Sequence, residues 1–256
     1  MFSTIILGAG KSTRMKANKS KLLFDIAGKP IITHIIEAVR HAKCSEIICV
    51  VNRESKDLVK LLKEHKVNIA FQKKSNGTAG AAEAGSKIIS SKNRKVLILC
   101  GDAPFVTTQS IKSMIKKISN ADACVGTVEL DIPKGYGRII RQGNKISEIV
   151  EERDSSIEQR SIREVNTGVI SINNSILNKY ISEIKNNNVK KEFYLTDIIK
   201  ILISKNYKVN TFKFDDELEV TGVNSKVDLV NLEKKYLRRK AEKLLEAGTL
   251  VRDPSK

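Results

Sequence analysis

The stretch LGAGKSTRMKANKSKLLFDIAGKP, residues 7–30, places Gly8, Gly10 and a series of basic residues directly after an apolar segment. Residues 3–7 predict a strand, and Pro30 predicts a helix start because proline is tolerated in the first helical turn. The apolar face of that helix carries Ile31, Ile32, Ile35, Ile36 and Val39. A glycine-containing loop between a strand and a helix lets backbone amides approach a phosphate closely.

Two familiar phosphate-binding motifs do not fit this loop. A P-loop requires GxxxxGK[ST], and Ile5, inside the predicted strand, stands where its first glycine should be. A dinucleotide fingerprint requires GxGxxG, and Thr13 stands where its third glycine should be. On the glycines alone, a solvated surface loop is an equally good interpretation. The loop also has three cations that can surround several phosphate groups: Lys11, Arg14 and Lys21.

The rest of the sequence predicts an α/β fold in which short apolar strands alternate with amphipathic helices. We expect a Rossmann-like, doubly wound, mostly parallel sheet with an antiparallel β insertion and a C-terminal exit helix. Strands are predicted at 46–51, 68–72, 96–100, 123–130, 164–172 and 208–214, with a hairpin at 138–141 and 146–150. Helices are predicted at 54–64, 78–90, 109–119, 175–185, 195–205 and 226–246, the last ended by Gly248.

Charge and composition limit the possible partners. The 256 residues carry a formal net charge of +17, which would suit an anionic partner. The basic residues form short, scattered runs, so we expect solvated lysine faces and no nucleic-acid partner. No apolar run approaches the ~20 residues of a membrane span. The four cysteines match no metal or disulfide spacing, which predicts buried, reduced thiols in a cytoplasmic protein.

Several later segments, taken in their order along the chain, help to interpret the opening loop. LGAGKSTRM, with Lys21 and Gly28-Lys29-Pro30, resembles the LAAGxGTRM signature of sugar-1-phosphate nucleotidyltransferases. The full series is most similar to the uridyltransferase domain of bacterial N-acetylglucosamine-1-phosphate uridyltransferases and spans nearly the whole chain. Its further members are QKKSNGT (72–78), GD (101–102), GYGR (135–138), IVE (149–151), EVNTG (164–168), YLTD (194–197) and EVTGVN (219–224).

This resemblance implies a reaction and a set of site residues. UMP would pass from UTP to N-acetylglucosamine 1-phosphate, giving pyrophosphate and UDP-N-acetylglucosamine for cell-wall peptidoglycan and lipopolysaccharide. Arg14 and Lys21 would be catalytic, and Lys11 would contact the triphosphate. Residues implied to hold the uridine are Leu7, Gly8, Ala9, Gly10, Gln72, Gly77 and Thr78, and Gly101 is implied to bind substrate. Residues implied to bind the sugar are Gly137, Glu151, Asn166 and Thr196; without the family, Glu151 and Asn166 would read as surface or strand-edge residues.

A magnesium site is implied at the end of a predicted strand. Asp102 follows residues 96–100, and ligands of open α/β sheets bind at the carboxyl ends of strands. Taken alone, a Gly-Asp pair there is more often a turn or a helix cap. The resemblance adds Asn224 as the second protein ligand, which suits Mg²⁺ because this ion prefers oxygen donors and retains several waters.

Departures from the family pattern leave alternatives open. Ser12 stands where the signature has glycine, so serine must tolerate the backbone angle used there. The resemblance makes residues 1–225 the nucleotidyltransferase domain and 226–256 a helix and tail, where the family's β-helix acetyltransferase would begin. This sequence contains no β-helix repeats, so we assign no acetyltransferase activity and expect a monomer or weak oligomer. A different sugar 1-phosphate or pyrimidine nucleotide, or a non-catalytic nucleotide-sugar-binding protein, are the alternatives.

Overall fold

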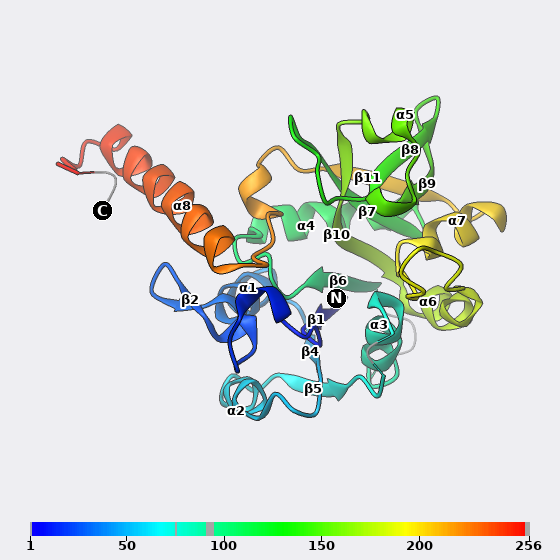
Figure 1. The fold of residues 1–256 in the computed structure, drawn as a ribbon, viewed down its shortest axis with the longest axis horizontal. Coiled ribbons are helices and arrows are strands. Elements are labelled where there is room, and N and C mark those ends of the chain that lie inside the picture. The colour runs from blue at the N-terminus through cyan, green and yellow to red at the C-terminus, as the bar shows by residue number, and fades with distance from the viewer. Residues whose placement is uncertain (1, 75, 91–94, 254–256) are drawn as a thin grey trace.

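The central sheet of the computed structural model, which describes residues 2–74, 76–90 and 95–253, is mixed and mostly parallel (Figure 1). Its strand order is β11-β7-β10-β6-β1-β4-β5. β10 runs antiparallel to both of its neighbours, whereas β1 pairs in parallel with β4 and β6. The main strands are β1 (Phe2–Leu7), β4 (Glu46–Val51), β5 (Asn68–Phe71), β6 (Lys95–Cys100), β7 (Ala123–Glu129), β10 (Glu164–Asn173) and β11 (Val209–Lys213).

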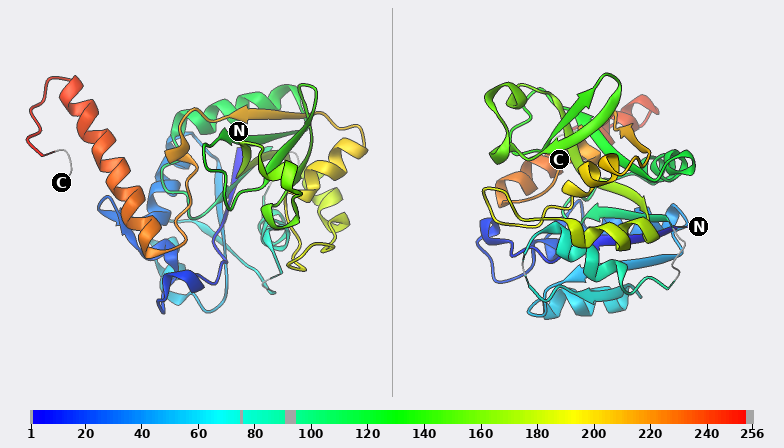
Figure 2. Two further views of the ribbon diagram at one scale, coloured as in Figure 1. Left: turned by 45° about the horizontal axis from the view of Figure 1, so that its top comes forward. Right: turned by 90° about the vertical axis from the view of Figure 1, so that its right-hand side faces the viewer.

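Helices cover both faces of this sheet (Figure 2). One apolar cluster joins the sheet to α1 (Ile31–His41), α2 (Lys56–Glu64) and α4 (Thr108–Lys117). A second cluster, on the other face, includes α3 (Thr78–Ser86), α6 (Asn174–Tyr180) and α7 (Asp197–Ser204). Because strands such as β1 and β4 are buried on both faces, their sequences are nearly continuous apolar runs. The expectation of a doubly wound α/β fold is confirmed.

The chain order creates a switch point between β1 and β6. From β1 the chain runs through α1 to β4 on one side, and α3 returns it to β6 on the other side of β1. Helices α1 and α3 therefore lie on opposite faces of the sheet. In such sheets the strands on either side of the switch leave a crevice at their carboxyl ends, which is where ligands bind. The loops after β1 and β6 both start in this crevice.

The antiparallel insertion stands beside this crevice. The predicted hairpin forms β8 (Arg138–Gln142) and β9 (Lys145–Val150), joined by a turn in which Gly143 has a φ of +58°. β8 also pairs with β10, which attaches the hairpin to the sheet, and α7 packs on β9. A short helix, α5 (Ile157–Arg160), follows the hairpin and has no clear sequence signal beyond its Ser-x-x-Gln capping box.

Several boundaries differ from the predictions. The predicted helix at 78–90 ends at Ser86, and the predicted helix at 175–185 is α6 followed by a 3₁₀ turn, Ile181–Glu183. The basic loop contains two unpredicted 3₁₀ turns, Thr13–Met15 and Lys21–Leu23, and a small hairpin of β2 (Asp25–Ile26) and β3 (Lys29–Pro30). Pro30 precedes α1 rather than lying within its first turn.

The exit helix α8 (Lys226–Glu246) has the predicted bounds and projects from the body of the fold (Figure 1). Its base is fixed by a stack of Tyr236 on Phe105, with ring centroids 3.9 Å apart, and by Glu233, which accepts a hydrogen bond of 2.7 Å from the amide of Ala27. Gly248 ends it as predicted, with a φ of +88°. The Gly248 amide donates to the Leu245 carbonyl at 2.9 Å, which satisfies one of the last carbonyls of the helix. Residues 254–256 of the predicted tail lie outside the described residues.

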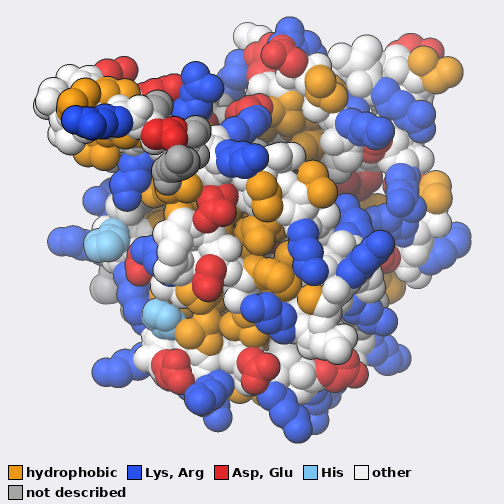
Figure 3. Space-filling view, turned by 60° about the vertical axis from the view of Figure 1, so that its left-hand side comes forward, with side chains coloured by type: hydrophobic (Ala, Val, Ile, Leu, Met, Phe, Trp, Pro, Cys, Tyr) orange, Lys and Arg blue, Asp and Glu red, His pale blue; other side chains and the backbone are white. Residues whose placement is uncertain are grey.

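Charge on the face drawn in Figure 3 is dispersed rather than concentrated. On this face, lysine and arginine side chains alternate with acidic and uncharged ones.

Two of the four cysteines, Cys49 and Cys124, are buried, and burial raises the pKa of each thiol to about 12. The other two, Cys44 and Cys100, are half-buried rather than buried as expected. Within the described residues, no helix is long and apolar enough to cross a bilayer.

Helix α3 approaches the sheet closely because its buried face consists of small residues. Gly85 packs over the fully buried Ile5 of β1. A Cβ atom on Gly85 would lie 2.7 Å from Ile5 Cγ2 and 3.1 Å from Val50 Cγ2. Contacts this short force neighbours to move, and neither side chain has free space in a close-packed core.

We predict that Gly85→Ala lowers the free energy of unfolding by about 1–3 kcal/mol, the usual cost of overpacking. Helix propensity alone predicts the opposite sign, because alanine is favoured over glycine by roughly 0.5–1 kcal/mol in a helix. Urea titration followed by circular dichroism measures the change. The exposed Lys87→Ala at the end of the same helix is the control, and a Gly85→Ala protein more stable than the parent would contradict this packing.

Candidate active site

Two adjoining cavities open at the carboxyl ends of β1 and β6. The loop cavity, of about 500 Å³, is lined by residues 7–13 of the basic loop together with Lys21, Gln72 and Gly77. The hairpin cavity, of about 540 Å³, is lined by residues of β10, by Glu151 directly after β9 and by the segment before α8. Both cavities share four lining residues, which mark their junction: Leu7, Thr78, Cys100 and Asp102.

The wall of the loop cavity depends on a glycine with an unusual backbone angle. Gly77 has a φ of +118°, and a Cβ atom there would lie 2.4 Å from the carbonyl oxygen of Phe193. No other residue fits, because both the angle and the space exclude a side chain. The Gln72 amide donates to the Gly77 carbonyl at 3.0 Å, which fixes the orientation of Gln72. Gln72 and Gly77 thus form one edge of the loop cavity.

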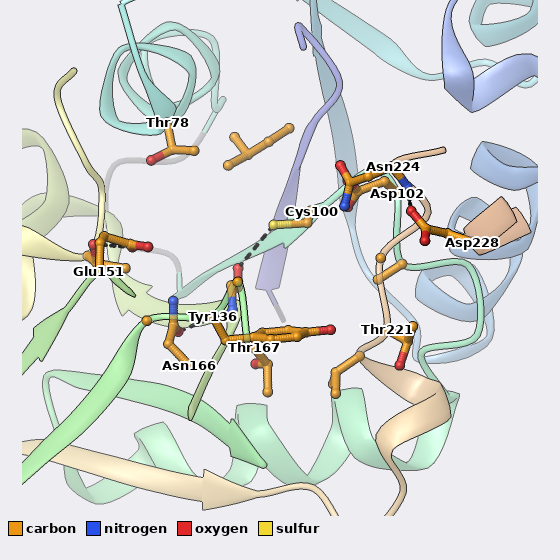
Figure 4. Close-up of a pocket in the computed structure, with 18 of the residues that line it drawn as sticks. Thr78, Cys100, Asp102, Tyr136, Glu151, Asn166, Thr167, Thr221, Asn224 and Asp228 are labelled. Atoms are coloured by element: carbon orange, nitrogen blue, oxygen red, sulfur yellow. Dashed lines mark hydrogen bonds between the residues drawn. The ribbon is translucent and has the colours of Figure 1, made fainter. Parts of the chain in front are cut away.

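The hairpin cavity collects polar groups from three separate elements (Figure 4). Thr196, just before α7, donates from its hydroxyl to Glu151 Oε1 at 3.2 Å. The Asn166 amide oxygen accepts from the Gly168 amide at 3.1 Å, where β10 bulges out of register. Asn166 and Gly137 are also joined, through a backbone hydrogen bond of 2.8 Å. The sequence-predicted residues Gly137, Glu151, Asn166 and Thr196 therefore all line one cavity.

Burial affects the chemistry of Glu151. Loss of solvent raises the pKa of its carboxyl, although the Thr196 hydroxyl and the nearby Lys190 partly oppose this shift. A carboxylate and an amide facing one cavity can accept from and donate to the hydroxyls of a polar ligand. The cavity is therefore better suited to a hydroxyl-rich ligand than to an apolar one.

A lysine lies at the junction of the cavities. The Lys21 ammonium donates to Asp102, forming an ion pair, and to Asn224 Oδ1 at 2.9 Å. The Arg14 guanidinium donates to the same Asn224 oxygen at 2.8 Å. Side-chain exposures of 14% for Lys21 and 21% for Asp102 make this ion pair mostly shielded from water. Two predicted catalytic cations and two predicted metal ligands thus meet at one point.

Second contacts hold these groups in place. Asp228 of α8 accepts from the amide of Asn224 at 3.1 Å and from the amide of Ser225 at 2.8 Å. The Asp102 carbonyl accepts from the Val223 amide at 2.8 Å. A side chain on Gly222 would lie 3.3 Å from Asp102 Oδ1. The segment before α8 is therefore fitted closely around Asp102.

The donor set at this junction fits a magnesium ion. Asp102 and Asn224 each direct a side-chain oxygen at the ammonium nitrogen of Lys21, so both oxygens can contact one cation. Mg²⁺ commonly takes one or two protein oxygens and completes its shell with water and substrate phosphates. Among the described residues, no group of three or more His, Cys, Asp or Glu side chains is placed to hold a metal. The residues therefore suit a hydrated, substrate-linked ion and not an all-protein cage.

Not every predicted residue has the expected place. Gly101 lines neither cavity; its amide donates to the Leu7 carbonyl at 3.0 Å, and a Cβ atom would lie 2.9 Å from that oxygen. The structure thus gives Gly101 a role in joining β1 to the β6 loop. Leu7, Gly8, Ala9, Gly10, Lys11 and Thr78 do line the loop cavity.

Sequence reasoning missed Tyr136 and Asp228. The Tyr136 ring lies between Asn166 and Thr221 in the hairpin cavity (Figure 4), and burial raises the pKa of its hydroxyl. The sequence did contain an indication of Tyr136, because this residue belongs to the GYGR segment. Asp228 completes a capping box with Ser225, and the Ser-x-x-Asp spacing before the predicted amphipathic helix was the sequence signal for it.

The raised pKa of Glu151 predicts a pH-dependent stability. Because the folded protein favours the protonated carboxyl, stability is complete below the ordinary pKa near 4.5 and falls as pH rises through the raised value. We predict that Glu151→Gln stabilises the protein relative to the parent, and that this gain is larger at pH 7.5 than at pH 4. Thermal unfolding across this range measures the difference.

Glu164 is a control with the opposite sign. Hydrogen bonds from Arg141 lower the pKa of this carboxyl, with distances of 2.7 and 2.6 Å to its two oxygens. Glu164→Gln should therefore destabilise the protein, and more so at pH 7.5 than at pH 4. A Glu151→Gln protein with no gain, or a gain that shrinks as pH rises, would contradict the effect assigned to burial.

Comparisons with known proteins identify the family. Residues 4–137 match the MobA-like NTP transferase domain. The chain is 39% identical over 253 residues to the bifunctional protein GlmU of Carboxydothermus hydrogenoformans, covering 98% of this chain and 56% of that protein. It is 34% identical over 255 residues to the bifunctional protein GlmU of Francisella tularensis subsp. novicida, covering 99% of this chain and 56% of that one. The chain thus spans little more than half the length of these relatives.

A solved structure has the same fold. It is a putative glucose-1-phosphate thymidylyltransferase from Bacillus anthracis in complex with sucrose, and it aligns with a TM-score of 0.73 over 91% of this chain and 94% of that one. Its sequence identity is 20%, so this likeness concerns the fold alone. The domain match covers β1, β6 and the junction residue Asp102. The chain belongs to the nucleotidyltransferase family described by the MobA-like NTP transferase domain.

Proposed function

We propose that this chain transfers UMP from UTP to N-acetylglucosamine 1-phosphate, releasing pyrophosphate and UDP-N-acetylglucosamine. The observation that carries the proposal is the meeting of two cavities at Asp102, where Lys21 of the loop cavity contacts both Asp102 and Asn224 of the hairpin cavity. A transfer between two substrates needs one pocket for each and a charged junction at which their phosphates meet. The ordered motifs and the similarity to two bifunctional GlmU proteins support this choice of substrates.

The loop cavity suits the nucleotide. Backbone amides of a glycine-containing loop and a fixed glutamine amide can pair with the donor and acceptor edge of uracil. Gln72 is fixed by its bond to Gly77, and Gly10 is exposed in the cavity wall, with space around its backbone. The triphosphate would then extend toward Lys11, Arg14 and Lys21.

The hairpin cavity suits the sugar phosphate. Glu151, Thr196 and Asn166 offer a carboxylate, a hydroxyl and an amide to the sugar hydroxyls and the acetamido group. Its phosphate would point to the junction, because Asp102 and Asn224 lie at the opposite end from Glu151 (Figure 4).

The reaction needs alignment more than proton transfer. An oxygen of the sugar phosphate, already anionic at neutral pH, forms a bond to the α-phosphorus of UTP. The bond from that phosphorus to the oxygen bridging the β-phosphate breaks, and pyrophosphate leaves. Lys21 and Arg14 are placed to stabilise the charge that gathers on the phosphate oxygens. Asp102 and Asn224 would hold Mg²⁺, which when bound neutralises further phosphate charge.

The location and assembly of the protein are also part of the proposal. A nucleotide-sugar synthase of this kind would act in the cytoplasm, where its nucleotide substrate is made and where buried thiols such as Cys49 stay reduced. We expect no membrane or nucleic-acid partner, and a monomer or weak oligomer for these residues alone.

Pyrophosphate release tests the proposal directly. We predict turnover with UTP and N-acetylglucosamine 1-phosphate that stops in EDTA and returns with Mg²⁺. dTTP, CTP, glucose 1-phosphate and glucosamine 1-phosphate should each give at least about tenfold lower kcat/KM, since a mismatched polar site leaves buried groups unpaired. Turnover without metal, or none with UTP, would contradict the proposal.

Asp102→Asn separates catalysis from folding in the same assay. It keeps the shape of the side chain but removes the charge, so activity should fall at least about a hundredfold while the protein still binds uridine nucleotide in metal-free buffer. Asp131→Asn is the control and should retain activity, because the Asp131 side chain is 90% exposed and lines neither cavity. Equal loss of binding and turnover in Asp102→Asn would indicate a purely structural carboxylate.

A further inference from the structure

The two proposed catalytic cations lie on separate short turns of the basic loop. Arg14 is in the 3₁₀ turn Thr13–Met15, and Lys21 begins the 3₁₀ turn Lys21–Leu23. Each turn is anchored on the core by one apolar side chain, Met15 at 0% exposure and Leu22 at 2%. Between the turns the chain is exposed. Met15 and Leu22 hold the two turns on the core, but the exposed segment between them does not fix the distance from one turn to the other. Other contacts must set that distance.

Ser12 connects these two turns. Its carbonyl accepts from the Met15 amide at 2.9 Å, which closes the first turn. Its hydroxyl oxygen accepts from the Lys21 amide at 3.1 Å, at the start of the second turn. The hydroxyl also donates to the Gly10 carbonyl at 3.4 Å. One residue thus joins the glycine segment, the Arg14 turn and the Lys21 turn.

The backbone of Ser12 makes this arrangement costly. Its φ of +54° and ψ of +25° place it in the left-handed region, which disfavours residues with a Cβ atom. The family signature has glycine here, which adopts such angles freely but has no hydroxyl. In this chain a residue with a Cβ atom and a left-handed backbone angle, Ser12, carries the hydroxyl that bridges the turns.

We propose that Ser12 is a positioning residue that sets the distance between Arg14 and Lys21, so that both cations reach the same Asn224 oxygen. The proposal rests on the proposed function insofar as these cations act on phosphates. Ser12 itself need not touch substrate. Its hydroxyl acts through the amide of Lys21, and its effect belongs to the charged transition state more than to nucleotide binding.

Three variants separate the hydroxyl from the backbone angle. Ser12→Gly removes the hydroxyl and the strain, Ser12→Ala removes only the hydroxyl, and Ser12→Asn keeps a side-chain acceptor in a residue that tolerates left-handed angles. We expect kcat to fall about fivefold in both Gly and Ala variants, the worth of one hydrogen bond between uncharged groups, while KM for UTP changes less than about twofold. Ser12→Asn should recover part of the lost kcat.

Hydrogen exchange supplies a readout that does not depend on activity. The peptide spanning residues 16–24 contains the Lys21 amide, so its exchange should become faster in Ser12→Gly and Ser12→Ala. Asn206→Gly is the matched control: Asn206 also has a left-handed φ, of +61°, but follows α7 away from both cavities. It should leave kcat and the exchange of this peptide unchanged.

The outcomes distinguish this inference from the proposed function. Unchanged kcat and exchange in Ser12→Gly, with an active parent protein, would overturn the role of Ser12. A loss confined to Ser12→Ala would overturn it too, because the backbone angle alone would then matter. A parent protein without uridylyl transfer, but with faster exchange in both variants, would contradict the proposed function and support the connection between the turns.

Discussion

The contact of the Lys21 ammonium with Asp102 and Asn224 joins three segments that are far apart in sequence. Lys21 comes from the loop after β1, Asp102 from the loop after β6, and Asn224 from the segment before α8. Because the ion pair is mostly shielded from water, breaking one side would leave a poorly solvated charge. The loop cavity and the hairpin cavity open on either side of this contact and share Asp102. The fold can therefore be understood as the scaffold that brings these three groups together.

Close packing around the switch point makes that scaffold possible. The small residues of α3 let it lie directly on β1, and Gly101 lets the β6 loop approach the end of β1. Gly77 and Gly222 remove side chains from the cavity edge and from the surroundings of Asp102. These positions explain why glycines recur in motifs whose chemistry is carried by other residues. The glycines provide space, and the charged and amide side chains bind and react.

The sequence indicated the fold because parallel strands buried on two faces, such as β1 and β4, are mostly apolar, and because α1 and α8 have a clear helical period. It could not indicate the 3₁₀ turns of the basic loop, which are fixed by the burial of Met15 and Leu22 and by hydrogen bonds that the Ser12 and Ser20 hydroxyls accept from backbone amides. The meeting of Asp102 with Asn224 came from family resemblance alone, since no local pattern connects them. Gly101 lines neither cavity, because a motif shows which residues recur and not which of their atoms face a cavity.

A crystal structure with UDP-N-acetylglucosamine and Mn²⁺ would test the central claim most directly, because the anomalous signal of manganese locates the ion independently of the protein density. The account predicts manganese bound by Asp102 and Asn224, uracil in the loop cavity beside Gln72, and the sugar in the hairpin cavity beside Glu151. A manganese ion held elsewhere, or a sugar ring outside the hairpin cavity, would contradict it.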